Sequence, residues 1–491
     1  MKSDEFYELL GEIDETAVSN AETPPVKKKK HTWVYALAST AAAACIALIA
    51  VTGVMKHSSS TQVQPKSESL PVSDEIIEAQ NMVLAEPVYP EMPMNPNLAN
   101  ENSFNEYWEK WREALSSLRD QPDGYTDGYD SFCIKSMRTF LSDTESENKV
   151  YSPLSLYMAL GMSAEITGGD TRQQILDVLS HKDIESLRSH ARSIWQANYI
   201  DDGMAKCVLA NSLWTNSNNK YKKETVDRLA GNYYASVYSG DPCTAEYTEL
   251  MRDRINKQTD GLLEGYVSDL KMEPNMLIKL VSTVNYSGKW EIMFSEDFTK
   301  QGTFHSPKGD AVCDFMNIEQ FLTYCRSEKF SSLSLPLDSN GVMRFILPDE
   351  GVSPEELLED DEAVSFMTQT DEDVYKNSKY VDADIYVPKF DVSANIDLTE
   401  GLESMGITDI FDSGKCDMTP LTDSIGTAVS KAEQDTRVMI DEHGCKAASM
   451  TVIDYCGSGI PDEKVTFRLD RPFIFEVIKD APLFVGIVND P

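Results

Sequence analysis

The 491-residue sequence lacks the clustered cysteines and histidines that hold metal ions or form dense disulfide frameworks. Its nine cysteines are scattered singly without a CxxC pair, and its six histidines show no HExxH or comparable ligand spacing. We therefore expect no metal and no cofactor. Most cysteines are expected to be buried thiols, with one or two disulfides left open as an alternative.

Positive charge is also scarce. The chain carries 44 Lys and Arg against 81 Asp and Glu, a formal net charge of −37. Because such a surface repels phosphate and sulfate polymers, we expect no nucleic-acid partner and no heparin-like partner. A hydrophobic content of 41% and a charged content of 25% are ordinary for a globular protein. At this length we expect one large domain with additional segments.

A catalytic constellation is missing as well. The candidate for a nucleophile turn is Gly457-Ser458-Gly459, but it lacks the strand-to-helix setting of a GxSxG elbow. No histidine stands in a recognisable triad pattern. We predict that the chain has no catalytic residue and is not an enzyme.

One long hydrophobic run is present. Residues 33–55 are 23 consecutive uncharged residues, enough for a helix to cross a hydrocarbon core of about 30 Å. Four lysines at 27–30 precede the run, so the positive-inside rule leaves residues 1–32 in the cytoplasm and the following chain outside. The sequence thus predicts a single-pass membrane protein. A cleaved signal peptide or lipidation of Cys45 is the alternative, but the run is long for a signal peptide and continues past Cys45.

The segment after this run predicts an extracytoplasmic tether over residues 56–124 with a helix near 103–118. Up to about residue 102 it is rich in Ser, Pro, Asn and Met. Ser103 and Glu106 predict a capping box at the helix start. Apolar side chains then recur at helical spacing, and we expect this stripe to pack on the large domain, with partner binding by its tryptophans as the alternative. The stripe comprises Phe104, Trp108, Trp111, Leu115 and Leu118.

Residues 125–491 predict the large domain. Helical patterns come first, at 155–166 and 170–179. Strand patterns follow at 345–347, 384–387, 465–469 and 473–478. Helices early and strands late predict an α+β fold and argue against a doubly wound parallel sheet.

Two motifs near the start of this domain predict helix caps. Residues 150–160 read VYSPLSLYMAL, in which Ser152 predicts a cap and Pro153 a first helical turn. Residues 168–175 read GGDTRQQI, in which Thr171 and Gln174 predict a second cap.

These motifs, together with five later ones in the same order and spacing, resemble the serpin family of serine protease inhibitors. The resemblance implies a fold of three β-sheets, about nine helices and an exposed reactive-centre loop. It also implies a covalent complex with a target serine protease and places the bait bond at Ser458–Gly459, because the count from Gly444 to Pro472 equals that of an inhibitory member. The later motifs are GKW (288–290), FILPDEG (345–351), PKF with residues 402–411, FRLDRPFIF (467–475) and LFVGIVNDP (483–491).

The resemblance also implies two groups of residues that control the loop. The loop hinge would be formed by Glu442, Gly444, Cys445, Ala447, Ala448, Ser449 and Thr451. The polar cluster beneath the main sheet and the entry point of the loop would be formed by Ser152, Ser155, Ser282, Gln434 and Trp290. Ser282 and Gln434 replace the Asn and His that are usual in the family, which changes the hydrogen-bonding groups that hold the sheet closed.

The loop sequence is compatible with insertion as a strand. Side chains alternate between the two faces of a strand, and both charges fall on one phase, that of Lys446 and Asp454. No proline interrupts residues 444–458, so every N–H can join a ladder, worth on the order of ten kcal/mol at roughly 0.5–1.5 kcal/mol per bond. The pattern therefore favours an inhibitor over a non-inhibitory binding or structural serpin. The uncharged phase is Cys445, Ala447, Ser449, Thr451, Ile453 and Tyr455.

The bait favours proteases with shallow pockets. Gly457 and Ser458 suit elastase-like or subtilisin-like enzymes, and the stretch 447–463 has no Arg or Lys for a trypsin-like enzyme. Cleavage near Tyr455 would instead indicate a chymotrypsin-like or papain-like target.

A separate hypothesis concerns Cys445, since an oxidised thiol at that hinge position would add bulk and block insertion.

Overall fold

The computed structural model describes residues 76–77, 82–98, 103–142, 146–274, 276–369, 377–424, 428–429, 432–445 and 463–491. The predicted segments 1–32 and 33–55 lie outside these ranges. None of the helices in the described ranges has both the length and the apolar character needed to span a bilayer.

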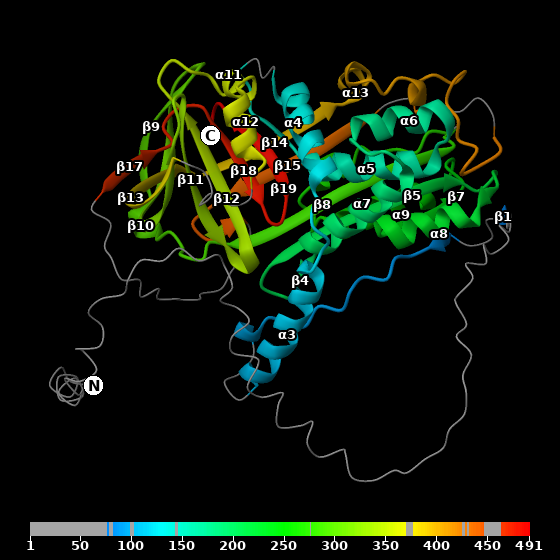
Figure 1. Cartoon of the computed structure of the whole chain (residues 1–491), viewed down its shortest axis with the longest axis horizontal. Helices are drawn as coiled ribbons and strands as arrows, with labels where there is room; N and C mark the ends of the chain where they lie inside the picture. The colour runs from blue at the N-terminus through cyan, green and yellow to red at the C-terminus, as the bar shows by residue number, and fades with distance from the viewer. Residues whose placement is uncertain are drawn as a thin grey trace, which may run out of the picture. The chain divides into compact units, whose positions relative to one another are not determined.

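Within the described ranges the chain forms eleven α-helices, most of which lie against one sheet (Figure 1). The helices are α3 (Phe104–Arg119), α4 (Asp127–Leu141), α5 (Pro153–Ile166), α6 (Gly169–Val178), α7 (Ile184–Asn198), α8 (Lys223–Tyr233), α9 (Ala245–Gln258), α10 (Glu264–Val267), α11 (Pro354–Leu358), α12 (Asp361–Met367) and α13 (Thr399–Met405).

A nine-stranded sheet occupies one end of the molecule. Its order is β17 (Lys464–Arg468), β13 (Ser378–Pro388), β10 (Gly309–Arg326), β11 (Phe330–Leu337), β12 (Gly341–Pro348), β18 (Phe473–Ile478), β19 (Pro482–Val488) and β3 (Lys149–Tyr151), with β9 (Lys300–Ser306) paired to β10. Every residue of β18 and β19 is buried, as their nearly continuous apolar sequences require for strands covered on both faces.

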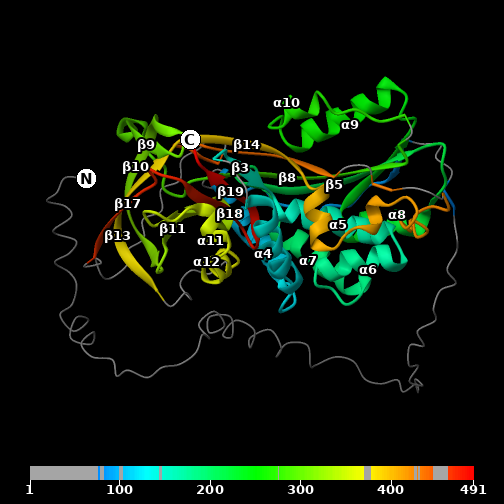
Figure 2. The same cartoon turned by 90° about the horizontal axis from the view of Figure 1, so that it is seen from above.

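The second large sheet has six strands. Its order is β16 (Gly444–Cys445), β8 (Ile278–Lys289), β5 (Lys206–Asn216), β7 (Ala235–Gly240) and β2 (Val83–Ala85), with β4 (Ile200–Asp201) paired to β5. A third, two-stranded sheet pairs β14 (Phe390–Asp397) with β15 (Glu433–Ile440), and a short ladder joins β1 (Ile76–Ile77) to β6 (Tyr221–Lys222). Helices α9 and α10 cover one face of the six-stranded sheet and α5 to α8 the other (Figure 2).

Helix α5 lies at the centre of this arrangement. All but one of its residues are buried, because it contacts helices on its flanks and strands of two sheets. As the sequence predicts, Ser152 caps the helix, accepting a hydrogen bond from the Ser155 N–H at 3.1 Å, and Pro153 is the first helical residue. The cap fixes Ser152 next to Ser155, whose hydroxyl reaches the Ser282 carbonyl of β8.

The other two predicted caps are wrong. Ser103 makes no capping hydrogen bond at α3, and Glu106 pairs instead with Lys110, one turn along the exposed face, at 2.8 Å. Helix α6 begins at Gly169, so Thr171 and Gln174 lie inside it and hydrogen-bond the backbone of residues 408–417. Both side chains are used for tertiary contacts, which the local pattern does not reveal.

The expected tether is partly integrated into the domain. Strand β2 pairs with β7 at the edge of the six-stranded sheet. Just beyond it, the Tyr89 ring packs against Trp195 and Tyr199, with centroids 5.1 and 5.8 Å away. Helix α3 is fixed by the Trp111 Nε1–H, which donates to the Asp202 carboxylate at 2.8 Å. Within residues 82–98 and α3, apolar burial thus replaces the free tether that the composition predicts.

Candidate functional site

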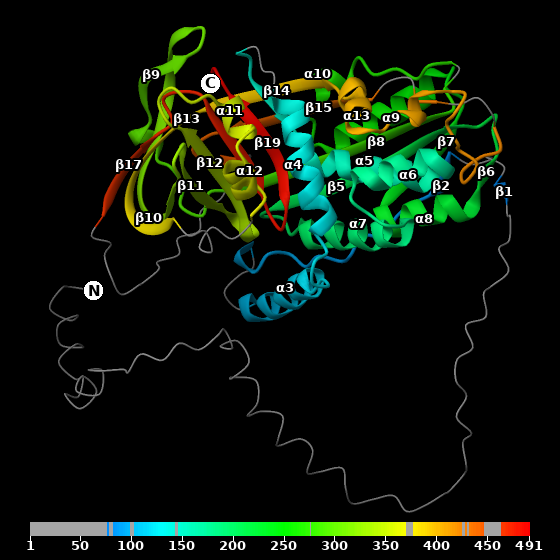
Figure 3. The ribbon, with the colours of Figure 1, turned by 45° about the horizontal axis from the view of Figure 1, so that its top comes forward.

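We call the six-stranded sheet together with the β14–β15 pair the main sheet, and the gap between β8 and β15 the slot. Strand β8 pairs with β5, and β15 pairs with β14, but β8 and β15, both fully described, form no ladder with each other. Figure 3 shows β14 and β15 running beside β8. Residues of both strands, including Ser282 and Gln434, line a cavity of about 30 Å³ between them, enough for a water molecule or two. Two facing strand edges without a shared ladder form a template for an added strand.

The entry to the slot is already occupied by the hinge. Gly444 and Cys445 form β16, which pairs antiparallel with Lys289 and Gly288 at the end of β8. Gly444 has φ +132°, and a Cβ there would stand 2.5 Å from the Gly288 carbonyl oxygen, so only glycine fits. Cys445 is 7% exposed. Two residues of the hinge itself, Gly444 and Cys445, therefore already lie in the sheet.

Trp290 closes this end of the slot. Its Nε1–H donates to the Asp441 carbonyl at 2.8 Å, and its ring packs edge-on against Phe294 at 5.7 Å. The side chain is buried, as is usual for a tryptophan whose N–H has found a partner. The turn that leads from β15 into β16 is thereby fixed to the end of β8.

Glu442 anchors the same turn through charge. Its buried carboxylate lies 2.8 Å from the Lys389 ammonium and accepts a hydrogen bond from the Thr299 hydroxyl at 2.7 Å. Burial raises the pKa of the Glu442 carboxyl, but the hydrogen bonds from Lys389 and Thr299 outweigh it and hold that pKa below its usual value. The hinge therefore carries a fixed negative charge in the folded chain.

A polar network crosses the middle of the slot. The Gln434 side chain accepts from the Ser152 N–H at 2.8 Å and donates to the Ser152 carbonyl at 3.0 Å. The Ser155 hydroxyl donates to the Ser282 carbonyl at 2.9 Å, and the Ser282 hydroxyl donates to the Asn211 side chain at 2.7 Å. Strands β15, β8 and β5 are thus linked through the capped end of α5.

Arg437 links the β14–β15 pair to the connection between α9 and α10. Its guanidinium makes two hydrogen bonds to the Asp391 carboxylate, at 2.8 and 2.6 Å, and a third to the Leu262 carbonyl at 3.4 Å. Leu262 belongs to the connection between α9 and α10, which cover the sheet. This contact joins the β14–β15 pair to the helices that cover the sheet.

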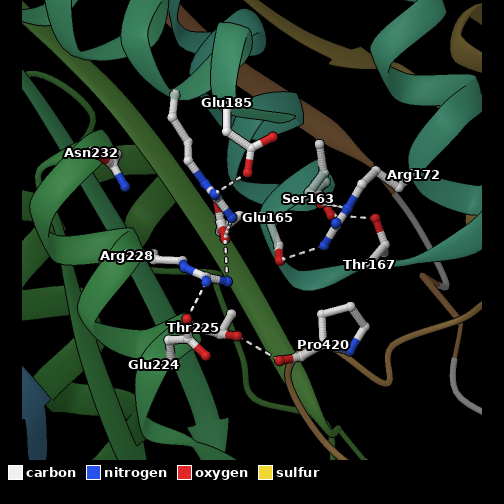
Figure 4. A network of polar contacts seen from close by, with 12 residues as sticks. Ser163, Glu165, Thr167, Arg172, Glu185, Glu224, Thr225, Arg228, Asn232 and Pro420 are labelled. Carbon is white, nitrogen blue, oxygen red and sulfur yellow. Dashed lines mark hydrogen bonds and ion pairs between the residues drawn. The ribbon is translucent and has the colours of Figure 1, made fainter. Parts of the chain in front are cut away.

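The far end of α5 is held by a buried ion pair (Figure 4). Glu165, completely buried, accepts two hydrogen bonds from Arg188 of α7, both at 2.6 Å, and lies 3.8 Å from Arg228 of α8. Removing one partner of such a pair typically costs about 3–5 kcal/mol. Helix α5 is therefore a fixed support for the network at its other end.

Comparison with known proteins gives consistent matches over this domain. The sequence profile of the family described as Serpin (serine protease inhibitor) matches residues 127–491, well over half of the chain. The chain belongs to the serpin family.

Individual relatives are distant. Alpha-1-antiproteinase of Rattus norvegicus is 26% identical over 399 residues, covering 77% of this chain and 93% of the relative. Alpha-1-antitrypsin 1-4 of Mus musculus is 26% identical over 377 residues, covering 73% and 87%. The native-state structure of the thermophilic serpin tengpin aligns with a TM-score of 0.65 at 26% identity, covering 76% of this chain and 95% of that one. The expected serpin fold with three sheets is confirmed, with eleven helices in the described ranges where about nine are expected.

The structure brings together those serpin site residues that it describes. Ser152, Ser155, Ser282 and Gln434 form one network, and Trp290, Glu442, Gly444 and Cys445 lie together at the entry. The predicted bait bond and the remaining hinge residues lie outside the described residues, namely Ser458, Gly459, Ala447, Ala448, Ser449 and Thr451.

Three further residues belong to the site and were not predicted. Asn211 extends the network to β5, Lys389 pairs with Glu442, and Arg437 bonds to the α9–α10 connection. The PKF motif contains Lys389, so the sequence held a signal for it. Asn211 and Arg437 carry no motif, and only the strand register places them here.

The hypothesis of a thiol switch at Cys445 finds little support in this conformation. Burial raises the pKa of the Cys445 thiol to about 12, and the side chain is shielded from solvent. Oxidants react with the accessible thiolate form of cysteine. With the hinge paired as observed, Cys445 is a protected thiol.

Proposed function

We propose that this serpin is an irreversible suicide-substrate inhibitor of serine proteases. The target would cut the loop and form an acyl-enzyme, and the cut loop would enter the slot between β8 and β15 as a new strand. The observation that carries this proposal is the hinge strand β16, which already pairs with β8 at the mouth of an unfilled slot.

The register of β16 supports insertion of the whole loop. Continued along β8, the same antiparallel register pairs Thr451 with Ser282 and Tyr455 with Ile278, the first residue of β8. Strand β8 is thus long enough to receive the loop to within three residues of Ser458.

The alternation of side chains supports it as well. Cys445 is buried, so the phase that it begins would face the interior, and that phase has no charge and opens with small residues. Lys446 and Asp454 would face outward. The names of the relatives, antiproteinase and antitrypsin, agree with inhibition.

The target class follows from the bait sequence alone. Ser458 preceded by Gly457 favours an elastase-like or subtilisin-like enzyme, and Tyr455 keeps chymotrypsin-like or papain-like enzymes as the alternative. A non-inhibitory serpin that acts as a binding or structural surface protein is the second candidate function. The pairing of β16 with β8 argues against it, because a loop that never inserts into the sheet needs no hinge strand paired beside the slot.

We also propose that the inhibitor is anchored at the outer face of a bacterial-type membrane through residues 33–55. The 23 uncharged residues and the preceding lysines at 27–30 support this topology. Proteolysis of intact cells checks it: an external protease should release the serpin domain while residues 1–32 stay protected. Protection of the whole chain would contradict the proposed orientation.

The inhibitory mechanism is tested by mixing the detergent-solubilised full chain with pancreatic-type elastase and analysing the products on a denaturing gel and by mass spectrometry. An inhibitor gives a band at the summed mass and a released peptide that begins at Gly459. Clean cleavage at Ser458–Gly459 without that band would favour the non-inhibitory alternative. If elastase leaves the loop intact, the same assay is repeated with chymotrypsin-like, subtilisin-like and papain-like enzymes. A covalent complex with one of them would mean that the bait bond is a different one. No complex with any of them would mean that the loop does not inhibit these proteases.

A further inference from the structure

The apolar stripe of helix α3 packs on the domain only in part. The sequence predicts packing for the whole stripe, and Leu115 and Leu118, in the second half of the helix, are buried as predicted. Phe104 and Trp108, in its first half, are instead 38% and 42% exposed. The helix therefore leaves two large aromatic side chains in contact with solvent.

Three aromatic rings form a row along this side of α3. The rings of Phe104 and Trp108 are stacked with their centroids 6.2 Å apart, and those of Trp108 and Trp111 with their centroids 5.6 Å apart. The inner end of the row is fixed, because Trp111 donates its Nε1–H to the Asp202 carboxylate. The two outer rings are thus held in place before they bind anything, so binding costs them little side-chain entropy.

The segment before α3 extends this apolar surface. The short helix η2 (Pro96–Leu98) contacts α3, and the Asn95 side chain donates at 2.8 Å to the Asp202 oxygen that also holds the helix. Met94 and Leu98 are each 43% exposed. Figure 3 shows α3 at the edge of the domain, next to α7. The apolar patch is defined as Met94, Leu98, Phe104 and Trp108.

Exposed apolar side chains are concentrated around this patch. Of the twelve large apolar side chains that are exposed in the described ranges, seven lie between residues 82 and 108. Such a concentration marks a surface that contacts a membrane or another protein. The seven are Met82, Val83, Val88, Met94, Leu98, Phe104 and Trp108.

The distribution of charge favours a lipid surface as the occupant. The whole chain carries a net charge of −37, but α3 is neutral, with three carboxylates and three basic side chains, and residues 92–98 carry no charge. An anionic lipid surface repels an acidic protein least where that protein is neutral. Tryptophan is also a residue that is enriched where a protein meets the membrane interface.

The proposed anchor keeps the patch within reach of a bilayer. Residues 56–75 join the predicted membrane helix to β1, and these 20 residues span at most about 70 Å when fully extended. The anchor thereby holds the domain at a high effective concentration near the surface. Contacts that are too weak to bind the free domain to a membrane then become populated.

We propose that the apolar patch is a second membrane contact, which rests on the bilayer that holds the anchor and places Phe104 and Trp108 among the lipid headgroups. The inference rests on the proposed membrane anchoring and is independent of protease inhibition. An amphipathic helix that lies in the interface is a known mode of attachment. With the anchor as the first contact, this second contact would fix the orientation of the serpin domain relative to the membrane.

Tryptophan emission of the full chain in vesicles tests the contact. The chain is reconstituted in phosphatidylcholine vesicles with and without bromine on the acyl chains, because brominated lipid quenches the tryptophans that it contacts. Trp33→Phe removes the one tryptophan of the predicted anchor, and three of the other five are buried in the domain. Quenching in the Trp33→Phe chain therefore reports on Trp108 and its neighbour Trp111.

The Trp33→Phe chain should lose emission in brominated vesicles, by up to about one fifth if one of its five tryptophans is fully quenched. Adding Leu98→Glu with Phe104→Glu should abolish the loss. The unfolding midpoint should not change, because both positions are exposed and a carboxylate in the first turn of a helix is favourable. Val312→Glu is the matched control, since Val312 is 72% exposed on β10, and it should keep the loss.

Three results would overturn the membrane contact while leaving the anchor intact. The first is no loss of emission in a Trp33→Phe chain that floats with the vesicles. The second is equal quenching with and without the two glutamates. The third is a Trp108 emission that shifts with protein concentration but not with brominated lipid, which would assign the patch to a second copy of the chain. If the chain does not float with the vesicles, the proposed anchor fails, and the membrane contact fails with it.

Discussion

Gln434 links strand β15 to the capped end of helix α5 through one side chain. Its amide makes reciprocal hydrogen bonds with the N–H and carbonyl of Ser152, a pairing that needs one donor and one acceptor in a single plane. The histidine usual in the family cannot form this pair from one ring nitrogen. The departure from the family pattern therefore keeps the link and changes its chemistry.

Gln434→Ala should destabilise the native chain by about 2 kcal/mol, because it leaves the buried Ser152 N–H without a partner and removes one of the two hydrogen bonds to the Ser152 carbonyl, the other coming from the Leu156 N–H. Denaturant unfolding measures the effect. Thr436→Val is the matched control, since Thr436 is also buried on β15 but makes a single weak bond of 3.3 Å. If the two variants were equally stable, the reciprocal pair would contribute nothing measurable.

The Glu442–Lys389 pair makes hinge stability depend on pH. The folded-state pKa of Glu442 is below its ordinary value of 4.5, so the folded chain holds the charged form more tightly than the unfolded chain. The pair's contribution is then fully present above about pH 4.5 and decreases as the pH falls through the lower, folded-state pKa.

Glu442→Gln should therefore lower stability at pH 7, by roughly 1.5–3 kcal/mol for a hydrogen-bonded charge, and the difference from the parent should shrink in acid. Unfolding midpoints of both chains at pH 7 and near pH 3 check this. A difference that is constant over this range would mean that the carboxylate's charge is not what stabilises the hinge.

Among the site residues, the sequence predicts those that belong to a motif. It misses those whose place in the site depends on which residues lie opposite each other on neighbouring strands. Ser152, Ser155 and Trp290 lie in recognisable motifs, Glu442 is assigned to the hinge by the resemblance, and the structure brings all four to the slot. Asn211 and Arg437 lie in strands with no distinctive pattern. Their roles depend on which residue of a neighbouring strand lies opposite, and local sequence does not encode that.

At the scale of elements, strand β2 and Tyr89 show that part of the segment before the serpin motifs packs on the domain. Its composition, rich in proline, methionine and asparagine, predicts a tether because it shows no period of two or of 3.6. Only the exposed edge of β7 and the aromatic pocket formed by α7 and α8 explain why it packs. Burial in a tertiary pocket overrides the local signal.

Tyr89→Ala should consequently lower stability by about 3 kcal/mol, the cost of removing a packed aromatic ring. Val88→Ala is the control, because Val88 is the preceding residue and is 88% exposed, so its removal should have almost no effect. Thermal unfolding of both variants distinguishes the packed segment from a free tether. Equal midpoints would mean that residues 82–98 do not contribute to the domain.

At the scale of the whole molecule, the proposed mechanism requires one more strand to enter between β8 and β15, which share no ladder in the native chain. Two strand edges face each other without a ladder, and the segment that could fill the position begins at β16. A chain cut within residues 446–462 would be free to complete the sheet. The cut molecule should therefore be more stable than the intact one, the reverse of what a nick does to most domains.

One charged side chain that faces the interior should remove this gain in stability of the cut chain. Cutting the parent loop should raise the unfolding temperature on the order of 15 °C, from an added ladder worth on the order of ten kcal/mol. Thr451→Asp should abolish the rise, because the continued register buries this position opposite Ser282. Val452→Asp, on the outward phase, should retain it. If the cut parent gains no stability, the loop does not insert and the slot does not trap a protease; if both variants lose the gain equally, insertion follows a register other than the one that β16 begins.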